Sequence, residues 1–146
     1  MVLALALTLA LPLAVAAPGG QDGRYEGEGV GTGGGANAVT IKFRVADDGR
    51  KIKDWRVLMF VICINPILPV QYTKQPMPTM KVDDDGRFRK VHRFDEDGVR
   101  ARIEVSGRLV GKRVKGGRLR YRVGACERAD EGEPVRWKAK RVTRNR

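Results

Sequence analysis

Apolar and polar residues alternate along much of the chain, which is the pattern of β-strands with one buried face. The clearest alternating segments are residues 39–45, 99–105, 118–125 and 135–140. Short turn sequences that end in Asp-Gly separate several of them, at residues 47–49, 84–86 and 97–98. No stretch after residue 17 has the periodicity of an amphipathic helix. We therefore predict an all-β fold, an antiparallel β-sandwich or small barrel of seven to eight strands.

Two further strands are expected in the first half of the chain. A weak strand is expected at residues 25–29, within a glycine-rich segment. A long strand is expected at residues 52–63, with Trp55, Val57, Met59 and Val61 on one face. Because Ile52 is out of phase with that face, we expect a β-bulge near Asp54.

An unusually apolar segment follows at residues 57–70. Its first eight residues, 57–64, are all apolar, so the segment is either buried on both faces or partly exposed. Four prolines then predict an irregular insertion at residues 64–78. If part of the segment is exposed, we expect the chain to be a partner- or lipid-binding module that binds through this segment. The residues of that apolar interface are Phe60, Ile62, Ile67 and Leu68.

The first sixteen residues have the pattern of a secretory leader. They carry no charged side chain and end in Ala14-Val15-Ala16, and the apolar run is too short to span a bilayer. We expect a signal-peptide helix at residues 1–16, with cleavage after Ala16. A glycine-rich N-terminal segment, 17–37, and a single β domain, 38–146, then follow. The prediction is a secreted or extracytoplasmic protein.

The chain has two cysteines, Cys63 and Cys126. An even number of cysteines in an exported protein favours a disulfide, with free thiols as the alternative. Cys63 is an even number of positions from Trp55, so it is expected on the same inward face of the strand. Cys126 is an even number of positions from the outward arginines, so it is expected to point outward. The pairing therefore requires a change of phase, which we expect as a bulge at Gly124.

Several of these segments together resemble a group of uncharacterised secreted all-β proteins of high-GC bacteria. The resemblance rests on the leader, residues 39–45 with their Asp-Gly turn, and the central cysteine. It continues through residues 107–111 (Gly-Arg-Leu-Val-Gly), 117–121 (Gly-Arg-Leu-Arg-Tyr), Cys126 and 135–139 (Val-Arg-Trp-Lys-Ala). It implies an all-β fold with a disulfide, and no known chemistry.

The charge of the chain is strongly positive, with 29 lysines and arginines, 17 acidic residues and a formal net charge of +12. Many of these cations fall on the outward positions of the expected strands. The candidate anion-binding residues are Lys42, Arg44, Arg100, Arg102, Arg118, Arg120, Arg122, Arg136, Lys138 and Lys140. If the strands share a sheet, these residues form one cationic face for a polyanion such as an envelope polymer or acidic glycan. The alternative is an ordinary solvated surface. No aromatic residues interleave on this face, so specific nucleic-acid recognition is not expected.

The remaining motifs do not predict an active site. Residues 29–34 match the Gly-x-Gly-x-x-Gly phosphate fingerprint, but a strand follows them where the fingerprint requires a helix. The acidic turns 83–86 and 95–98 resemble calcium loops, but an EF-hand would place a cation at the first ligand position. The single serine, Ser106, and the single histidine, His92, lack the context of a nucleophile or catalytic base. We predict a non-enzymatic domain without a cofactor or metal. The alternative is an enzyme of unrecognised type, whose acid–base groups would be sought around Asp54, His92 and Glu104.

Overall fold

The computed structural model describes residues 20–30, 38–63, 70–128 and 132–143. All of the helices and strands that could be assigned in these residues are β-strands, and there is no helix among them. The strands are β1 (Gly23–Gly29), β2 (Thr40–Ala46), β3 (Lys51–Cys63), β4 (Val70–Pro76), β5 (Met80–Lys81), β6 (Arg87–Glu96), β7 (Val99–Val110), β8 (Arg113–Val123), β9 (Cys126–Arg128) and β10 (Val135–Val142). The prediction of an antiparallel all-β fold is confirmed. The strands form one continuous sheet of ten, of which eight lie on its main path.

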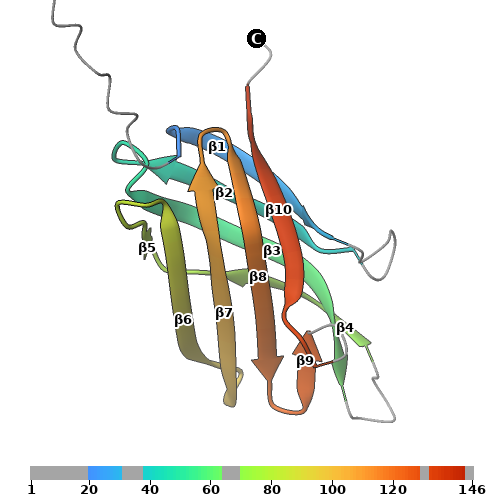
Figure 1. Cartoon of the computed structure of the whole chain (residues 1–146). Helices are drawn as coiled ribbons and strands as arrows, with labels where there is room; N and C mark the ends of the chain where they lie inside the picture. The colour runs from blue at the N-terminus through green and yellow to red at the C-terminus, as the bar shows by residue number, and fades with distance from the viewer. Residues whose placement is uncertain (1–19, 31–37, 64–69, 129–131, 144–146) are drawn as a thin grey trace, which may run out of the picture.

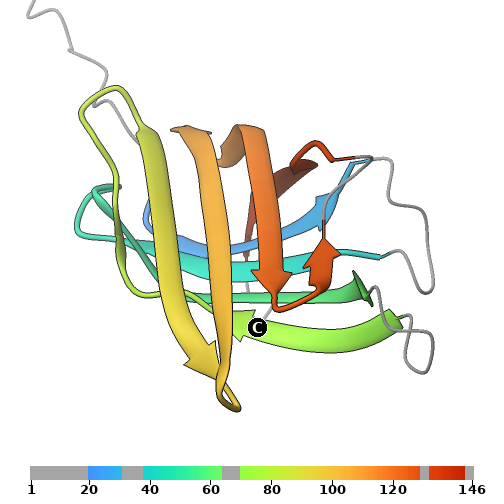
Figure 2. The same ribbon diagram turned by 90° about the horizontal axis from the view of Figure 1, so that it is seen from below.

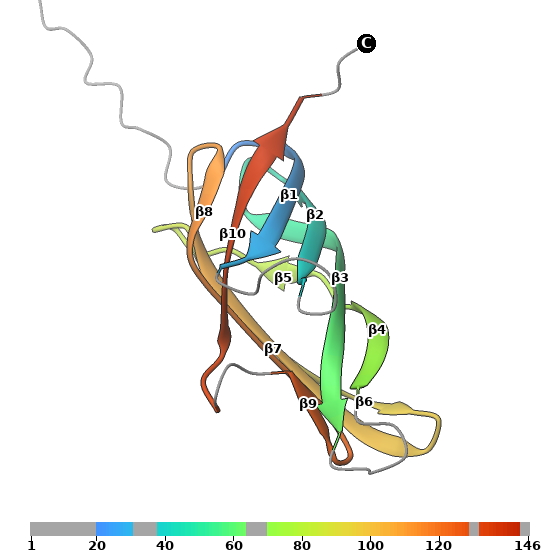
Figure 3. The same cartoon turned by 90° about the vertical axis from the view of Figure 1, so that its right-hand side faces the viewer.

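The sheet curls into a half-barrel around its core (Figure 1). Its order is β10-β1-β2-β3-β9-β8-β7-β6, and β4 and β5 pair with the free edge of β3. One side of the curl holds β6, β7 and β8, and the other holds β1 to β4 (Figure 2). Strand β10 pairs with both β1 and β8 and so connects the two sides (Figure 3). Strand β9 connects them a second time, because it pairs with both β3 and β8.

The core between the two sides is built around aromatic side chains. The rings of Tyr25 and Phe43 stack with centroids 5.2 Å apart, and Phe43 stacks on Trp55 at 5.5 Å. Trp137 meets Trp55 edge to face at 5.3 Å. These residues come from β1, β2, β3 and β10, so the aromatic contacts hold neighbouring strands in register. Aliphatic residues, methionines and two further aromatic residues, Phe88 and Tyr121, make up most of the rest of the core.

A bulge in β8 interrupts the alternation of that strand. Gly117 pairs with Trp137 of β10, but the next paired residues toward the start of β8 are shifted by one. The same shift occurs against β7. Gly116 takes a φ of +61°, a backbone conformation that favours glycine. The adjacent Gly117 leaves the space into which Trp137 packs, because an added Cβ would come within 2.5 Å of the indole.

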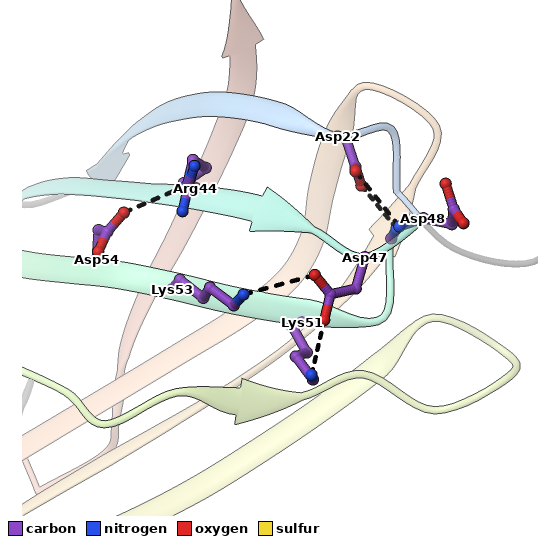
Figure 4. A network of polar contacts seen from close by, with 8 residues as sticks. Asp22, Arg44, Asp47, Asp48, Lys51, Lys53 and Asp54 are labelled. Carbon is purple, nitrogen blue, oxygen red and sulfur yellow. Dashed lines mark hydrogen bonds and ion pairs between the residues drawn. The ribbon is translucent and has the colours of Figure 1, made fainter.

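The turn between β2 and β3 forms at residues 47–50, as the sequence predicts, and is tied to the start of β1 (Figure 4). The Asp22 carboxylate accepts the backbone N–H of Gly49 at 2.8 Å and that of Asp48 at 3.3 Å. On the other side of the turn, Asp47 pairs with Lys51 at 2.6 Å. The hydrogen bond from Lys51 lowers the pKa of Asp47. Further along β3, the predicted bulge at Asp54 is confirmed.

The predicted disulfide between Cys63 and Cys126 is present. The predicted bulge at Gly124 is wrong, because the change of phase comes from a reversal of the chain. Gly124 and Ala125 form a two-residue turn after β8, with a φ of +52° at Gly124, and Cys126 begins the separate strand β9. This reversal places Cys126 directly opposite Cys63 of β3.

The predicted irregular insertion at residues 64–78 contains a regular strand. Residues 70–76 form β4 against β3, and Pro76 is its last residue. The free edge of a sheet tolerates proline, which lacks a backbone N–H to donate. Residues 64–69 lie outside the described residues, as do the leader and residues 31–37. Among the described residues, no helix has the length and apolar character needed to cross a membrane.

Candidate functional site

Four rows of outward side chains cross β6, β7 and β8. Residues directly opposite each other on antiparallel strands point to the same face of the sheet, so the strand register defines each row. Three rows consist mainly of cations: Arg87–Arg108–Lys115, Arg89–Ser106–Arg118 and Arg93–Arg102–Arg122. The fourth row, between the last two, contains Val91, the carboxylate of Glu104 and the guanidinium of Arg120. All residues of the three cationic rows are exposed except Ser106, which is half-buried. The outer side of this three-stranded region is therefore dominated by cations.

The ten predicted anion-binding residues all lie on the strands where the sequence places them. Nine are exposed, and Arg120 is half-buried. They belong to one sheet, but its curvature places Lys42 and Arg44 on β2, across the curl from β7 and β8 (Figure 2). The cations therefore wrap around the molecule and do not lie on one flat face.

Carboxylates interrupt the cations on the side formed by β1, β2, β3 and β10. Glu26 of β1 pairs with Lys42 at 3.5 Å, and Glu28 pairs with Lys138 at 3.2 Å. Glu26 also lies directly opposite Lys140. The same region contains the ion pair between Arg44 and Asp54, at 3.3 Å (Figure 4). These ion pairs compensate Lys42, Arg44 and Lys138, but the four strands together carry ten lysines and arginines against three acidic residues, so this side also keeps a positive field.

Three arginines on β7 and β8 are also paired with carboxylates. Arg102 contacts Glu104 at 2.9 Å. Glu127 of β9 contacts Arg122 at 2.9 Å and Arg120 at 3.5 Å. These pairs are exposed and hold the arginine side chains near the sheet surface, which leaves less positive charge for an external anion.

The row formed by Arg89, Ser106 and Arg118 differs from the rows beside it. Arg89, Ser106 and Arg118 lie in register on β6, β7 and β8, and Arg136 of β10 lies directly opposite Arg118. Among the described residues, none of these three arginines has an ion pair. Arg118 and Arg136 are like charges directly opposite each other, an arrangement that destabilises a sheet. Together with Arg89 they concentrate positive charge that no carboxylate among the described residues compensates.

Two depressions of the outer surface meet at this row. One has a volume of about 750 Å³ and extends over the start of β6, the last part of β7 and the start of β8, where it reaches Lys115 and Gly116. The other has a volume of about 270 Å³ and extends to Arg120 and the loop before β10. Arg89, Ser106 and Arg118 line both depressions. Arg89 and Arg118 therefore combine the lack of an ion pair among the described residues with open space beside them.

An acidic turn lies at one end of the larger depression. The Asp83 carboxylate accepts the backbone N–H of Arg87 at 2.6 Å, and Asp85 contacts the Arg87 guanidinium at 2.9 Å. The hydrogen bond with Asp85 raises the pKa of Asp83 and lowers that of Asp85. Asp83 therefore keeps its proton to a higher pH than Asp85.

The apolar segment contributes to the core at alternate residues. Val57, Met59 and Val61 are buried, and Phe60 between them is half-buried. Ile67 and Leu68 lie outside the described residues, and so does the side chain of Ile62.

The only serine and the only histidine of the chain point to opposite faces of the sheet. Ser106 is paired with the exposed Arg89 and Arg118, whereas His92 is opposite the buried Ile103. The His92 ring stacks on Phe94, with centroids 5.0 Å apart. Within the described part of the chain, no group of three histidine, cysteine or acidic residues is placed to hold a metal ion.

Sequence reasoning did not single out the cations of β6. Arg87, Arg89 and Arg93 follow a two-residue period, but Lys90 and His92 put polar residues on the other face as well. Only the pairing of β6 with β7 shows which of these side chains share a face with Arg118. Comparison with protein families, curated proteins and solved structures found no match.

Proposed function

We propose that this chain is an extracellular, non-enzymatic binding domain that holds an anionic polymer on the outer face of β6, β7, β8 and β10. The observation that carries the proposal is the row Arg89, Arg118 and Arg136, which has no ion pair among the described residues. The net charge of +12 supports it, because a positive field of this size attracts polyanions before contact.

The disulfide is consistent with an oxidising compartment such as the outside of the cell. The proposed leader would deliver the chain there. An envelope polymer or acidic glycan is the expected partner, since its negative charges repeat along a chain and can contact several arginines at once. The opposite orientations of Ser106 and His92 support a binding role, because they separate the usual nucleophile and base.

Salt-dependent retention on a polyanion column tests the proposal. We expect elution of the wild type to need high salt, with a steep salt dependence. The Arg118→Gln/Arg136→Gln double variant should elute at clearly lower salt. The matched control is Arg24→Gln/Arg56→Gln, which removes the same charge from exposed positions on β1 and β3. Equal losses in the two double variants would show that net charge alone governs retention and would refute the proposed face.

A further inference from the structure

We propose that Arg89, Ser106 and Arg118 form a seat for a phosphate group carried by the bound polymer. This inference rests on the proposed function and assigns its ligand chemistry. The three residues lie side by side on three neighbouring strands and point to the same face. Adjacent strands are separated by ~4.8 Å, so the backbones of the two arginines lie ~10 Å apart on either side of the serine.

The space around the serine suits a group on a longer chain. Both surface depressions reach Ser106, one from each direction along the strands. On the side of the larger depression, the neighbouring Gly116 has open space where a side chain would lie. A polymer can therefore continue past the seat in both directions while one of its charged groups sits over Ser106.

The arginines around the seat favour a strongly anionic group, and Glu104, the one carboxylate among the described residues that lines the smaller depression, is paired with Arg102. The flanking Arg102 and Arg120 are each paired with a glutamate, whereas Arg89 and Arg118 have no ion pair among the described residues. Arg136, opposite Arg118, adds a third uncompensated charge. A phosphate monoester carries between one and two negative charges near neutral pH, which matches the two flanking guanidinium groups.

The donor set also favours a tetrahedral group over a planar one. Each guanidinium presents a fork of N–H donors, and one such fork satisfies the two oxygens of a carboxylate. Two forks approaching from opposite sides, with a hydroxyl donor between them, offer more donors than one carboxylate can accept. A phosphate ester has three terminal oxygens in three directions, and so it can use both forks and the Ser106 hydroxyl together.

Three dextran derivatives matched in length and in charge per sugar test the seat: dextran phosphate, dextran sulfate and carboxymethyl dextran. We expect the wild type to bind dextran phosphate about tenfold more tightly than carboxymethyl dextran. Ser106→Ala keeps the charge and removes one donor, so it should weaken phosphate binding about fivefold and leave carboxymethyl binding unchanged. Arg89→Gln and Arg118→Gln should each abolish the preference. Arg56→Gln, the control on β3, should weaken binding to all three polymers by the same small factor.

The outcomes separate the seat from the proposed function. Equal binding of all three polymers, with no effect of Ser106→Ala, would refute the seat and leave the cationic face in place. A preference for dextran sulfate would refute the charge argument that selects phosphate. Failure to bind any of the three polymers would refute the proposed function together with the seat. Thermal melting of each variant confirms that the altered protein is folded.

Discussion

Removing the disulfide should lower the free energy of unfolding by about 4 kcal/mol. The bridge joins cysteines 63 residues apart, and cross-linking a loop of that length reduces the chain entropy of the unfolded state by an amount equivalent to about 4 kcal/mol at 25 °C. Small domains have total stabilities of about 5–15 kcal/mol, so the bridge is a large share of the whole.

The bridge also has a local role in this fold. Strands β3 and β9 are joined by only two residue pairs, Ile62–Glu127 and Cys63–Cys126. This short ladder is one of the two connections between the sides of the curl. Without the disulfide, we expect β9 to separate from β3 more often than β7 separates from β8, which are paired along most of their length.

Equilibrium denaturation of the oxidised wild type and the Cys63→Ala/Cys126→Ala variant measures the loss of stability. The fluorescence of the buried Trp55 and Trp137 reports unfolding. Amide hydrogen exchange measures the separation of β9 from β3, and should show faster exchange in β9 of the variant. A loss below about 1 kcal/mol would refute the entropy argument, since the model gives several times that value. Unchanged exchange in β9 would refute the local role.

Three smaller changes test the packing, the turn and one ionisation. Gly117→Ala places a methyl group 2.5 Å from Trp137 and should destabilise the fold by about 2 kcal/mol, measured by denaturation; a neutral result would contradict the close packing. Asp22→Ala removes the acceptor of the Gly49 N–H and should cost about 1 kcal/mol, with unchanged stability arguing against the contact. Burial raises the pKa of Tyr25 above its ordinary value of 10.0, so its contribution to stability is complete below that pH and is lost as the pH rises through the folded pKa. Stability measured above pH 10.0 should fall less steeply in Tyr25→Phe, and identical slopes would contradict the assignment.

The strands were predictable where one face is buried and the other is solvated. The alternation in β2, β7 and β10 is regular, because each inward residue contacts the core and each outward residue meets water. Strand β4 was not predictable, since Pro76 and the prolines before and after the strand indicate a loop, and its strand conformation depends on pairing with β3. The closure of the curl was not predictable either, because it depends on β10 pairing with β1 and β8, which are distant in sequence.

The candidate site was predictable residue by residue but not as a group. Parity placed Arg118 and Arg136 on the outer surface, and the structure has them there. The alternation of residues along one strand does not show which strands are neighbours or which residues lie opposite each other. The neutralising role of Glu26 and the proximity of Arg89 to Arg118 both depend on register, and register is set by turns and bulges distributed over the whole sheet.

The bulge at Gly116 links the core to the candidate site. Val114 and Leu119 are both buried, although they are an odd number of positions apart and regular alternation would send them to opposite faces. The extra residue in β8 resolves this conflict, because it shifts the phase of the strand by one between them. Downstream of the bulge, Arg118 then faces outward and lies opposite Ser106 on one side and Arg136 on the other. The phase change that buries Leu119 therefore also aligns the arginine row, so selection for a packed core constrains the positions of the charges on the surface.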